Sequence, residues 1–239
     1  MPKAEKAAGE VSPALVLFDI DGTLIRRAGP QHREALVDAV RRVAGLGSTT
    51  DNIPVQGMLD RDILAIMMRN AGATQTAIRR SMPELVRTAQ VVYVRTCPDL
   101  QKKVCPGVRR VLAGLERRGV PAGLVTGNLT RIAWKKMERA GLKQYFRFGS
   151  FAEHAKDRAG LVRLAIRRAR QEGWIDRRSR ISLIGDHPND IRAARANGVQ
   201  AIAVATGIEP GEELAAHHPD ILLPDMRSLS FEMLLGNHR

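Results

Sequence analysis

The chain of 239 residues has two cysteines, little aromatic content and no long apolar run. Cys97 and Cys105 form neither a Cys-x-x-Cys pair nor part of a set with metal-ligand spacing, so neither a disulfide framework nor a zinc site is indicated. No run approaches the roughly 18 to 20 apolar residues that span a bilayer, so no membrane association is expected. Residues 1–13 are polar and lack the apolar core of a signal peptide. We expect a cytoplasmic protein with reduced thiols and a disordered tail over residues 1–13.

The apolar content is sufficient for a core, although that core must be mainly aliphatic. Hydrophobic residues make up 44% of the chain and aromatic residues only 4%. A chain of this length suits one large domain or two small ones.

The net charge of +13 raises the question of nucleic-acid binding, because phosphate backbones attract lysine and arginine. The basic residues, however, occur as scattered doublets on expected helix surfaces, where a solvated face is the usual explanation. No aromatic strip for base stacking accompanies them. We therefore expect no specific nucleic-acid partner, and a positive field that attracts small anionic substrates.

The most informative segment is residues 18–24, with the sequence FDIDGTL, which follows the apolar residues 15–17. This pattern predicts a buried strand, because the run is apolar on both faces. Side chains two residues apart on an extended chain point the same way, so Asp19 and Asp21 should lie together where the strand ends. Two carboxylates so close repel unless a cation or shared proton relieves them, and Mg²⁺ suits such oxygen ligands. An ordinary Asp-Gly turn is the alternative.

From residue 106 onward, helical patterns alternate with short apolar runs. The expected helices cover residues 106–119, 129–140, 158–172 and 190–196, and the expected strands cover residues 121–126, 146–151, 181–184, 199–204 and 221–223. This alternation predicts an α/β fold with a Rossmann-like, doubly wound parallel sheet and right-handed crossovers. Ligands of such folds bind at the carboxyl ends of the strands.

The segment before this repeat has a different pattern. Helices are expected over residues 31–46, 58–71 and 76–95, with no strand between them. We predict a small α-helical domain over residues 27–102, inserted into an α/β core formed by residues 14–26 and 103–239. The alternative is a single fused domain on which these helices pack.

Two later segments extend the pattern of the first. Residues 124–128 end an apolar run in Thr-Gly-Asn, and residues 181–190 place a Gly-Asp pair after a strand, with another aspartate four residues later. In order and spacing, these segments resemble the motifs of the haloacid dehalogenase superfamily, over residues 14–227. The inserted helices resemble the helical cap of the subclass that includes phosphoglycolate phosphatase and β-phosphoglucomutase.

The resemblance implies roles for four aspartates. Asp19 would be the nucleophile that forms an aspartyl-phosphate, and Asp21 would protonate the leaving alcohol and then activate water. Mg²⁺ would be held by Asp19, Asp21 (through its backbone carbonyl) and Asp186. Asp190 would orient the ligands or waters of the metal; a turn and helix cap is the alternative for Asp186 and Asp190.

The cation of the family's third motif has two candidates here. Lys156 matches the usual lysine by position, but Asp157 stands where the family has proline. Arg158 lies nearer the expected helix start and offers a bidentate fork. We prefer Arg158 because Asp157 can form an ion pair with Lys156. Both residues remain candidates for this cation.

Substrate contacts are implied at three further positions and suggested at a fourth. The Thr126 hydroxyl would bind a phosphate oxygen, together with backbone N–H groups of Gly127 and Asn128 at a helix N-terminus. A plain strand-to-helix turn explains the same residues. Arg61, in the segment that resembles the cap's specificity region, would meet a second anionic group of the substrate; the alternative is a surface helix charge.

The favoured function is a Mg²⁺-dependent phosphatase that hydrolyses small phosphomonoester metabolites through an aspartyl-phosphate, similar to phosphoglycolate phosphatase. A dehalogenase is disfavoured by Asp21, and residues 25–60 lack the lysine of a phosphonate hydrolase. A phosphomutase of the β-phosphoglucomutase type remains an alternative. A non-catalytic or nucleic-acid-associated binding module is a second, disfavoured by the complete aspartate set.

Overall fold

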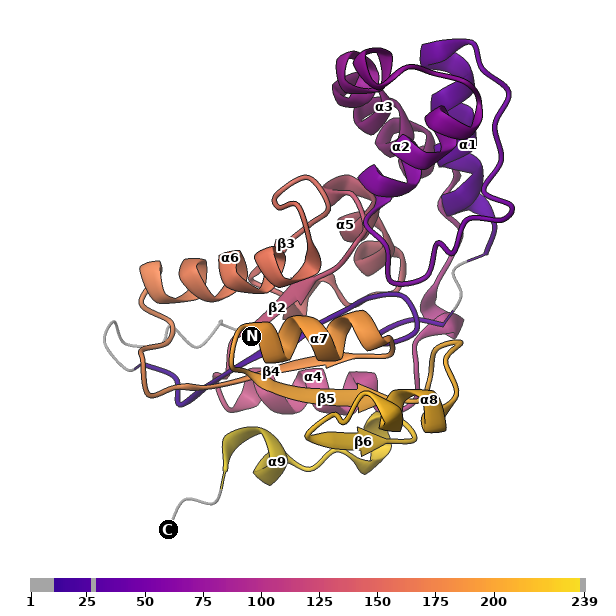
Figure 1. The fold of residues 1–239 in the computed structure, drawn as a ribbon. Coiled ribbons are helices and arrows are strands. Elements are labelled where there is room, and N and C mark those ends of the chain that lie inside the picture. Colours follow the sequence, from indigo (N-terminus) through magenta and orange to yellow (C-terminus); the bar gives the residue numbers. More distant parts are fainter. Residues whose placement is uncertain (1–10, 27–28, 237–239) are drawn as a thin grey trace.

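The apolar runs form a single parallel sheet in the computed structural model, which describes residues 11–26 and 29–236 (Figure 1). The strands lie in the order β3-β2-β1-β4-β5-β6. Their bounds are β1 (Ala14–Phe18), β2 (Ala122–Val125), β3 (Phe148–Ser150), β4 (Arg180–Gly185), β5 (Gln200–Val204) and β6 (Ile221–Leu223). The predicted Rossmann-like, doubly wound α/β sheet is confirmed.

The register brings the carboxyl ends of the three central strands to one level. Phe18, the last residue of β1, pairs with Leu124 of β2 and with Ile184 of β4. The loops after these strands therefore start side by side. The chain order reverses at β1, where open α/β folds bind their ligands.

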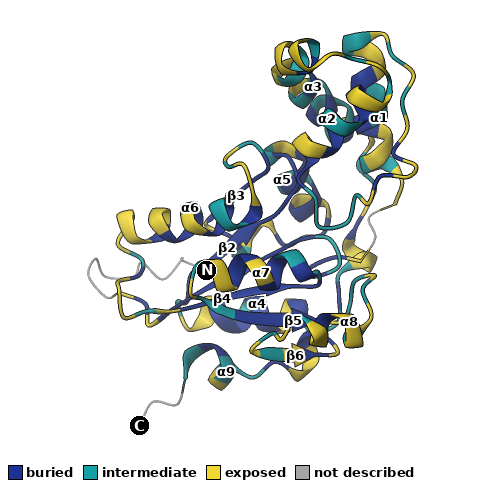
Figure 2. Cartoon of the chain, in the orientation of Figure 1, coloured by how far each residue is buried: buried dark blue, intermediate teal, exposed yellow. Residues whose placement is uncertain are grey.

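Helices cover both faces of the sheet, because successive side chains of each strand point to opposite faces. Leu15 and Leu17 belong to the cluster that includes α6 (Arg158–Gln171) and α7 (Pro188–Ala196). Val16 and Phe18 belong to the cluster on the other face. That cluster includes α4 (Val108–Arg117) and α9 (Phe231–Leu235). In Figure 2 the central strands are buried, and the outer sides of the helices are exposed.

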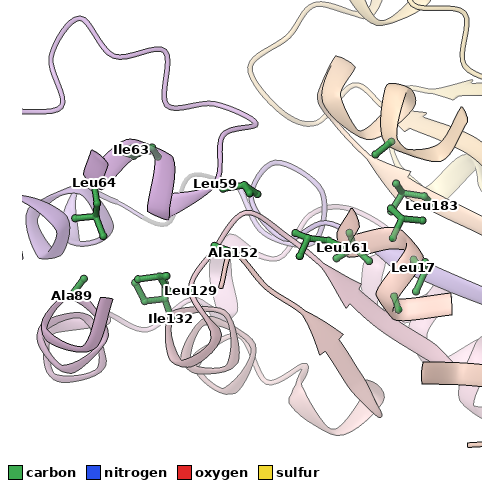
Figure 3. Close-up of a cluster of buried hydrophobic side chains, with 14 of the residues drawn as sticks. Leu17, Leu59, Ile63, Leu64, Ala89, Leu129, Ile132, Ala152, Leu161 and Leu183 are labelled. Carbon is green, nitrogen blue, oxygen red and sulfur yellow. The ribbon is translucent and has the colours of Figure 1, made fainter. Parts of the chain in front are cut away.

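The first three helices pack together beyond the carboxyl end of the sheet (Figure 1). We name α1 (Gln31–Ala44), α2 (Asp60–Asn70), α3 (Gln75–Thr96) and the loops between them the helical unit. Helix α5 (Thr130–Arg139) contacts α3 and lies between the helical unit and the sheet. The apolar core is continuous across this junction, running from Leu17 past Leu129 and Leu59 to Leu64 (Figure 3).

The remaining elements are short. They are α8 (Gly211–Ala216) and the single 3₁₀ turns η1 (Gln101–Lys103), η2 (Lys143–Tyr145) and η3 (Met226–Ser228). Neither α8 nor α9 was predicted from the sequence. None of the helices in the described part of the chain combines the length and apolarity needed to cross a membrane.

Several boundaries differ from the predictions, for local reasons. The helix expected from residue 190 starts at Pro188, because His187 caps it. The helix expected from residue 58 starts at Asp60, whose backbone N–H donates to the Gly127 carbonyl. Ser12, within the predicted tail, is buried and its N–H donates to the carbonyl of Trp174; residues 1–10 lie outside the described residues.

Candidate active site

A cavity of about 1080 Å³ lies at the carboxyl end of the sheet, with one wall formed by the helical unit. It brings together seven of the residues singled out from the sequence. These are Asp19, Asp21, Thr126, Gly127, Asn128, Arg158 and Asp186. The remaining three, Asp190, Lys156 and Arg61, are not among the lining residues.

Three buried carboxylates converge below this cavity. Asp19, Asp186 and Asp190 each offer an oxygen atom, and these atoms lie within 4.8 Å of one another. Burial and the neighbouring charges of Asp19 and Asp190 raise the pKa of Asp186 well above its ordinary value. An oxygen-rich site with such repulsion fits a hard divalent cation, which would relieve it.

Two features of the surroundings fit a bound cation. Oδ1 of Asp19 is buried and accepts no hydrogen bond from the described residues, and its one ion-pair contact among them is with Nη1 of Arg158. The Asp186 carboxylate lies against the backbone of Gly22 and Gly207, where any Cβ would overlap it. Thr23 holds it by donating a hydrogen bond of 2.8 Å to Oδ1. The site is therefore built around carboxylate oxygens at fixed positions.

Arg158 balances part of this negative charge. It is 8% exposed, and its Nη1 lies 2.5 Å from Asp190 and 3.2 Å from Asp19. Although its burial opposes charging, the charges of Asp190 and Asp19 raise the pKa of Arg158. Its position is set by Asp157, whose side chain caps α6.

Lys156, the other candidate for this cation, is exposed and does not line the cavity. The reason is the helix start: Asp157 is the N-cap, so Arg158 is the first helical residue and Lys156 lies outside the helix. Among the described residues Asp157 forms no ion pair with Lys156; its Oδ1 instead accepts a hydrogen bond of 2.7 Å from the N–H of Gly160. The structure therefore places only Arg158 against the acidic cluster.

Arg61 also points away from the cavity. It is exposed on α2, whereas its neighbour Asp60 is 2% exposed and lines the cavity. Adjacent residues on a helix lie about 100° apart around its axis, so the two side chains cannot share one face. The predicted contact between Arg61 and a second anionic group is not supported by this placement.

Asn128 is bonded within this site through its side chain and its backbone N–H. Its Nδ2 donates to Asp21 Oδ2 and to Thr126 Oγ1, each at 2.8 Å. Its backbone N–H is 3.4 Å from the same Thr126 oxygen. Because Oγ1 of Thr126 accepts these bonds, the Thr126 hydroxyl proton is free to donate to another acceptor. Thr126 lines the cavity, so a bound ligand can be that acceptor.

The N-terminus of α5 is capped by side chains from other elements. The N–H of Leu129 donates to Asp60, at 2.8 Å. The N–H of Arg131 donates to Gln90 of α3, at 2.7 Å. The N–H groups of Leu129 and Arg131 therefore donate to side chains of the helical unit. The N–H of Thr130, between them, donates to Glu153.

Lys136, a residue not predicted to belong to the site, is fully buried on α5. Its Nζ lies 2.8 and 2.6 Å from the two carboxylate oxygens of Asp21. Burial favours the neutral acid, but the charge of Lys136 and the hydrogen bonds from Lys136 and Asn128 hold the pKa of Asp21 below its ordinary value. The available signal was periodicity, because Lys136 shares the buried face of the helix with Ile132 and Ala133.

Comparisons with known proteins agree with this geometry. A family described as haloacid dehalogenase-like hydrolase matches residues 13–198. A phosphoglycolate phosphatase of Pseudomonas syringae pv. tomato is 27% identical over 228 residues, which cover 91% of this chain and 78% of that protein.

Solved structures share the fold. A predicted phosphoglycolate phosphatase of Haemophilus somnus superposes with a TM-score of 0.64 at 18% identity, covering 91% of this chain and 96% of that one. A β-phosphoglucomutase of Clostridium difficile superposes with a TM-score of 0.66 at 17% identity, covering 92% and 94%. At these identities the structures establish the fold alone. The family match spans most of the chain and includes every residue from Asp19 to Asp190, and the protein therefore belongs to the haloacid dehalogenase-like hydrolases.

Proposed function

We propose that this protein is a Mg²⁺-dependent phosphatase that hydrolyses small phosphomonoester metabolites through an aspartyl-phosphate. The observation that carries the proposal is the contrast between two aspartates at one strand end. Asp19 lies with the acidic cluster beside Arg158, whereas both oxygens of Asp21 are held by Lys136. The two carboxylates thereby have different electrostatic surroundings, as a nucleophile and an acid-base group require.

In the proposed first step, a carboxylate oxygen of Asp19 attacks the phosphorus atom, and the bond to the leaving alcohol breaks. This step uses the protonated form of Asp21, the minor form at its lowered pKa, which gives its proton to the alcohol oxygen. In the second step, Asp21 takes a proton from water as the water oxygen attacks the phosphorus of the aspartyl-phosphate. Inorganic phosphate leaves, and both aspartates return to their starting states.

Thr126 and Arg158 are placed to bind the transferring phosphate group. Thr126 lines the cavity with its hydroxyl proton available, and Arg158 brings a fixed positive charge beside the nucleophile. Phosphoryl transfer depends mainly on such positioning and charge stabilisation, because negative charge is spread over the oxygens in the transition state.

The acidic cluster is where Mg²⁺ would bind. Asp19 and Asp186 are the proposed side-chain ligands, with the backbone carbonyl of Asp21 as the third protein ligand. Both oxygens of Asp190 are already engaged, one by Arg158 and the other by the N–H of His187, which favours an orienting role for it. When bound, Mg²⁺ would neutralise charge on the phosphate and on the crowded carboxylates.

We further propose that the helical unit, together with the segments that join it to the sheet, is the cap domain over residues 27–102. It forms one wall of the cavity. Its Gly57 carbonyl accepts a hydrogen bond from Asn189 in the first turn of α7, and its Asp60 N–H donates to Gly127 in the loop after β2. A site covered in this way favours small substrates and excludes water from the chemistry. The sequence relatives named phosphoglycolate phosphatase support a compact anionic phosphomonoester.

The test is release of inorganic phosphate from a panel of phosphorylated metabolites, including 2-phosphoglycolate and sugar phosphates. Activity should require Mg²⁺, disappear on thorough chelation and return when Mg²⁺ is restored. Asp19→Asn should abolish turnover while circular dichroism shows an intact fold. Conversion of a sugar phosphate into its isomer without phosphate release would instead identify a phosphomutase, and full activity of Asp19→Asn would exclude the proposed nucleophile.

A further inference from the structure

The buried ammonium group of Lys136 has no hydrogen-bonding capacity left for a substrate. An ammonium has three N–H donors and no acceptor. Nζ of Lys136 meets the Asp21 carboxylate at 2.6 Å, Oδ1 of Asn128 at 2.6 Å and Nδ1 of His32 at 3.2 Å. Lys136 therefore has three partner residues for its three N–H donors. It fixes other side chains, in contrast to a lysine that binds phosphate.

The contact with Lys136 determines the tautomer of His32. Because the ammonium can only donate, Nδ1 of His32 must accept, and the ring proton of the neutral histidine is then on Nε2. That nitrogen lies 3.0 Å from Oδ2 of Asp60, to which it donates. Asp60 is itself held by the backbone N–H of Leu129, at 2.8 Å.

This network crosses between the helical unit and the sheet-bearing part of the chain. Lys136 lies on α5, whereas His32 and Asp60 come from α1 and α2. Tyr93 of α3 is fully buried beside the network, with its ring centre 5.9 Å from Nζ of Lys136. The ammonium group is therefore enclosed and fully bonded only when the helical unit is in contact with α5.

We propose that Lys136, oriented through His32 and Asp60, is a positioning residue that fixes the Asp21 carboxylate, and that contact of the helical unit with α5 completes this arrangement. The inference rests on the proposed phosphatase function, in which Asp21 protonates the leaving alcohol. The inference concerns what keeps the Asp21 carboxylate in place. Two residues of the helical unit, His32 and Asp60, orient Lys136, and Lys136 in turn holds Asp21.

The network acts on proton transfer rather than on phosphate binding. None of its three donors is free for substrate, so its loss should lower kcat and leave KM nearly unchanged. The loss should depend on the leaving group, because an alkyl alcohol requires protonation as it leaves and p-nitrophenolate does not. This pattern separates positioning of Asp21 from a general loss of folded enzyme.

The experiment compares an alkyl phosphate from the metabolite panel with p-nitrophenyl phosphate, at saturating Mg²⁺. For Lys136→Met we expect kcat on the alkyl ester to fall by at least about a hundredfold and on the aryl ester by less than about tenfold. KM should change by less than about threefold for both esters. Arg41→Ala, an exposed position near the far end of α1, is the control.

Substitutions at His32 test whether Lys136 is oriented through His32 and Asp60. They also provide a test of the proposal if Lys136→Met does not fold. Glutamine can accept from Lys136 with its oxygen and donate to Asp60 with its nitrogen, whereas leucine can do neither. His32→Leu should lower kcat on the alkyl ester by at least about tenfold, and His32→Gln should stay within about threefold of the wild type. Equal losses for both esters, a raised KM at constant kcat, or no advantage of glutamine over leucine would each overturn the proposal.

Nuclear magnetic resonance of the ¹⁵N-labelled protein tests the network without any activity. The expected spectrum of His32 is that of a neutral ring with its proton on Nε2. A proton on Nδ1, or on both nitrogens, would overturn the network even in an active enzyme. If the wild type hydrolyses neither ester, the proposed function fails, and the His32 spectrum then decides on its own whether the contacts exist.

Discussion

Arg158 should be the cation on which phosphoryl transfer depends. Its guanidinium lies 3.2 Å from Asp19, so the Coulomb attraction is about 5 kcal/mol at an effective dielectric constant of about 20. Removing one preorganised, buried donor from such a site lowers transition-state stabilisation by about 3 kcal/mol, or roughly a hundredfold in kcat/KM. We expect this loss for Arg158→Met.

Lys156→Met is the matched variant, because it removes a positive charge two positions away in the sequence. Lys156 is exposed and outside the cavity, so kcat/KM should change by less than about twofold. Both variants should be assayed by phosphate release from the best metabolite of the panel, below their midpoints of thermal unfolding.

Stability gives a second measurement for the same residue. Arg158→Met leaves Asp19, Asp186 and Asp190 without their buried counter-charge, and deleting one partner of a buried ion pair costs about 3–5 kcal/mol. Unfolding without Mg²⁺ should therefore occur at lower denaturant concentration in Arg158→Met than in Lys156→Met. A loss of activity in Lys156→Met that matches or exceeds the loss in Arg158→Met would refute this reasoning.

Three further predictions follow from the geometry. Asp186→Ala should raise the Mg²⁺ concentration needed for half-maximal activity by at least about tenfold, since one of the few ligands is lost, and an unchanged Mg²⁺ titration would contradict the metal site. Gly127→Ala places a Cβ 2.1 Å from the backbone oxygen of Met58, so it should push the helical unit away and lower kcat/KM; Gly47→Ala, where a Cβ meets nothing within 4 Å, should leave it unchanged, and equal effects would contradict the contact. Burial raises the pKa of Cys105 to about 11, so its thiol should resist alkylation at pH 8 in the native protein and react after unfolding, as peptide mapping would show.

Much of the fold is determined locally by the sequence. The apolar run at residues 15–18 predicts a strand covered on both faces, and β1 is buried along its whole length. The predicted helix over residues 76–95 corresponds to α3, over Gln75–Thr96, because the apolar periodicity persists and Thr74 caps the helix. Such signals depend on neighbours within a few positions, so they can be found without the tertiary structure.

The positions of Asp19, Asp21 and Asp186 also followed from sequence. Asp19 and Asp186 stand directly after β1 and β4, Asp21 follows Asp19 by two positions, and the carboxyl ends of parallel strands meet at one edge of a sheet. The two short C-terminal helices, α8 and α9, were not predicted, because five or six residues give too few turns for a periodic pattern.

What only the tertiary structure decided is which charged side chains are buried and what each one contacts. Lys156 and Arg158 are equivalent in sequence until the cap of α6 is placed, and Arg61 differs from Asp60 only by its rotation around α2. Lys136 contacts Asp21 across 115 positions of chain, and its burial is tolerated because every donor is satisfied by a residue from a different element. Local propensity carries no information about such contacts, since the free energy of burying a charge depends on partners that only the folded chain brings together.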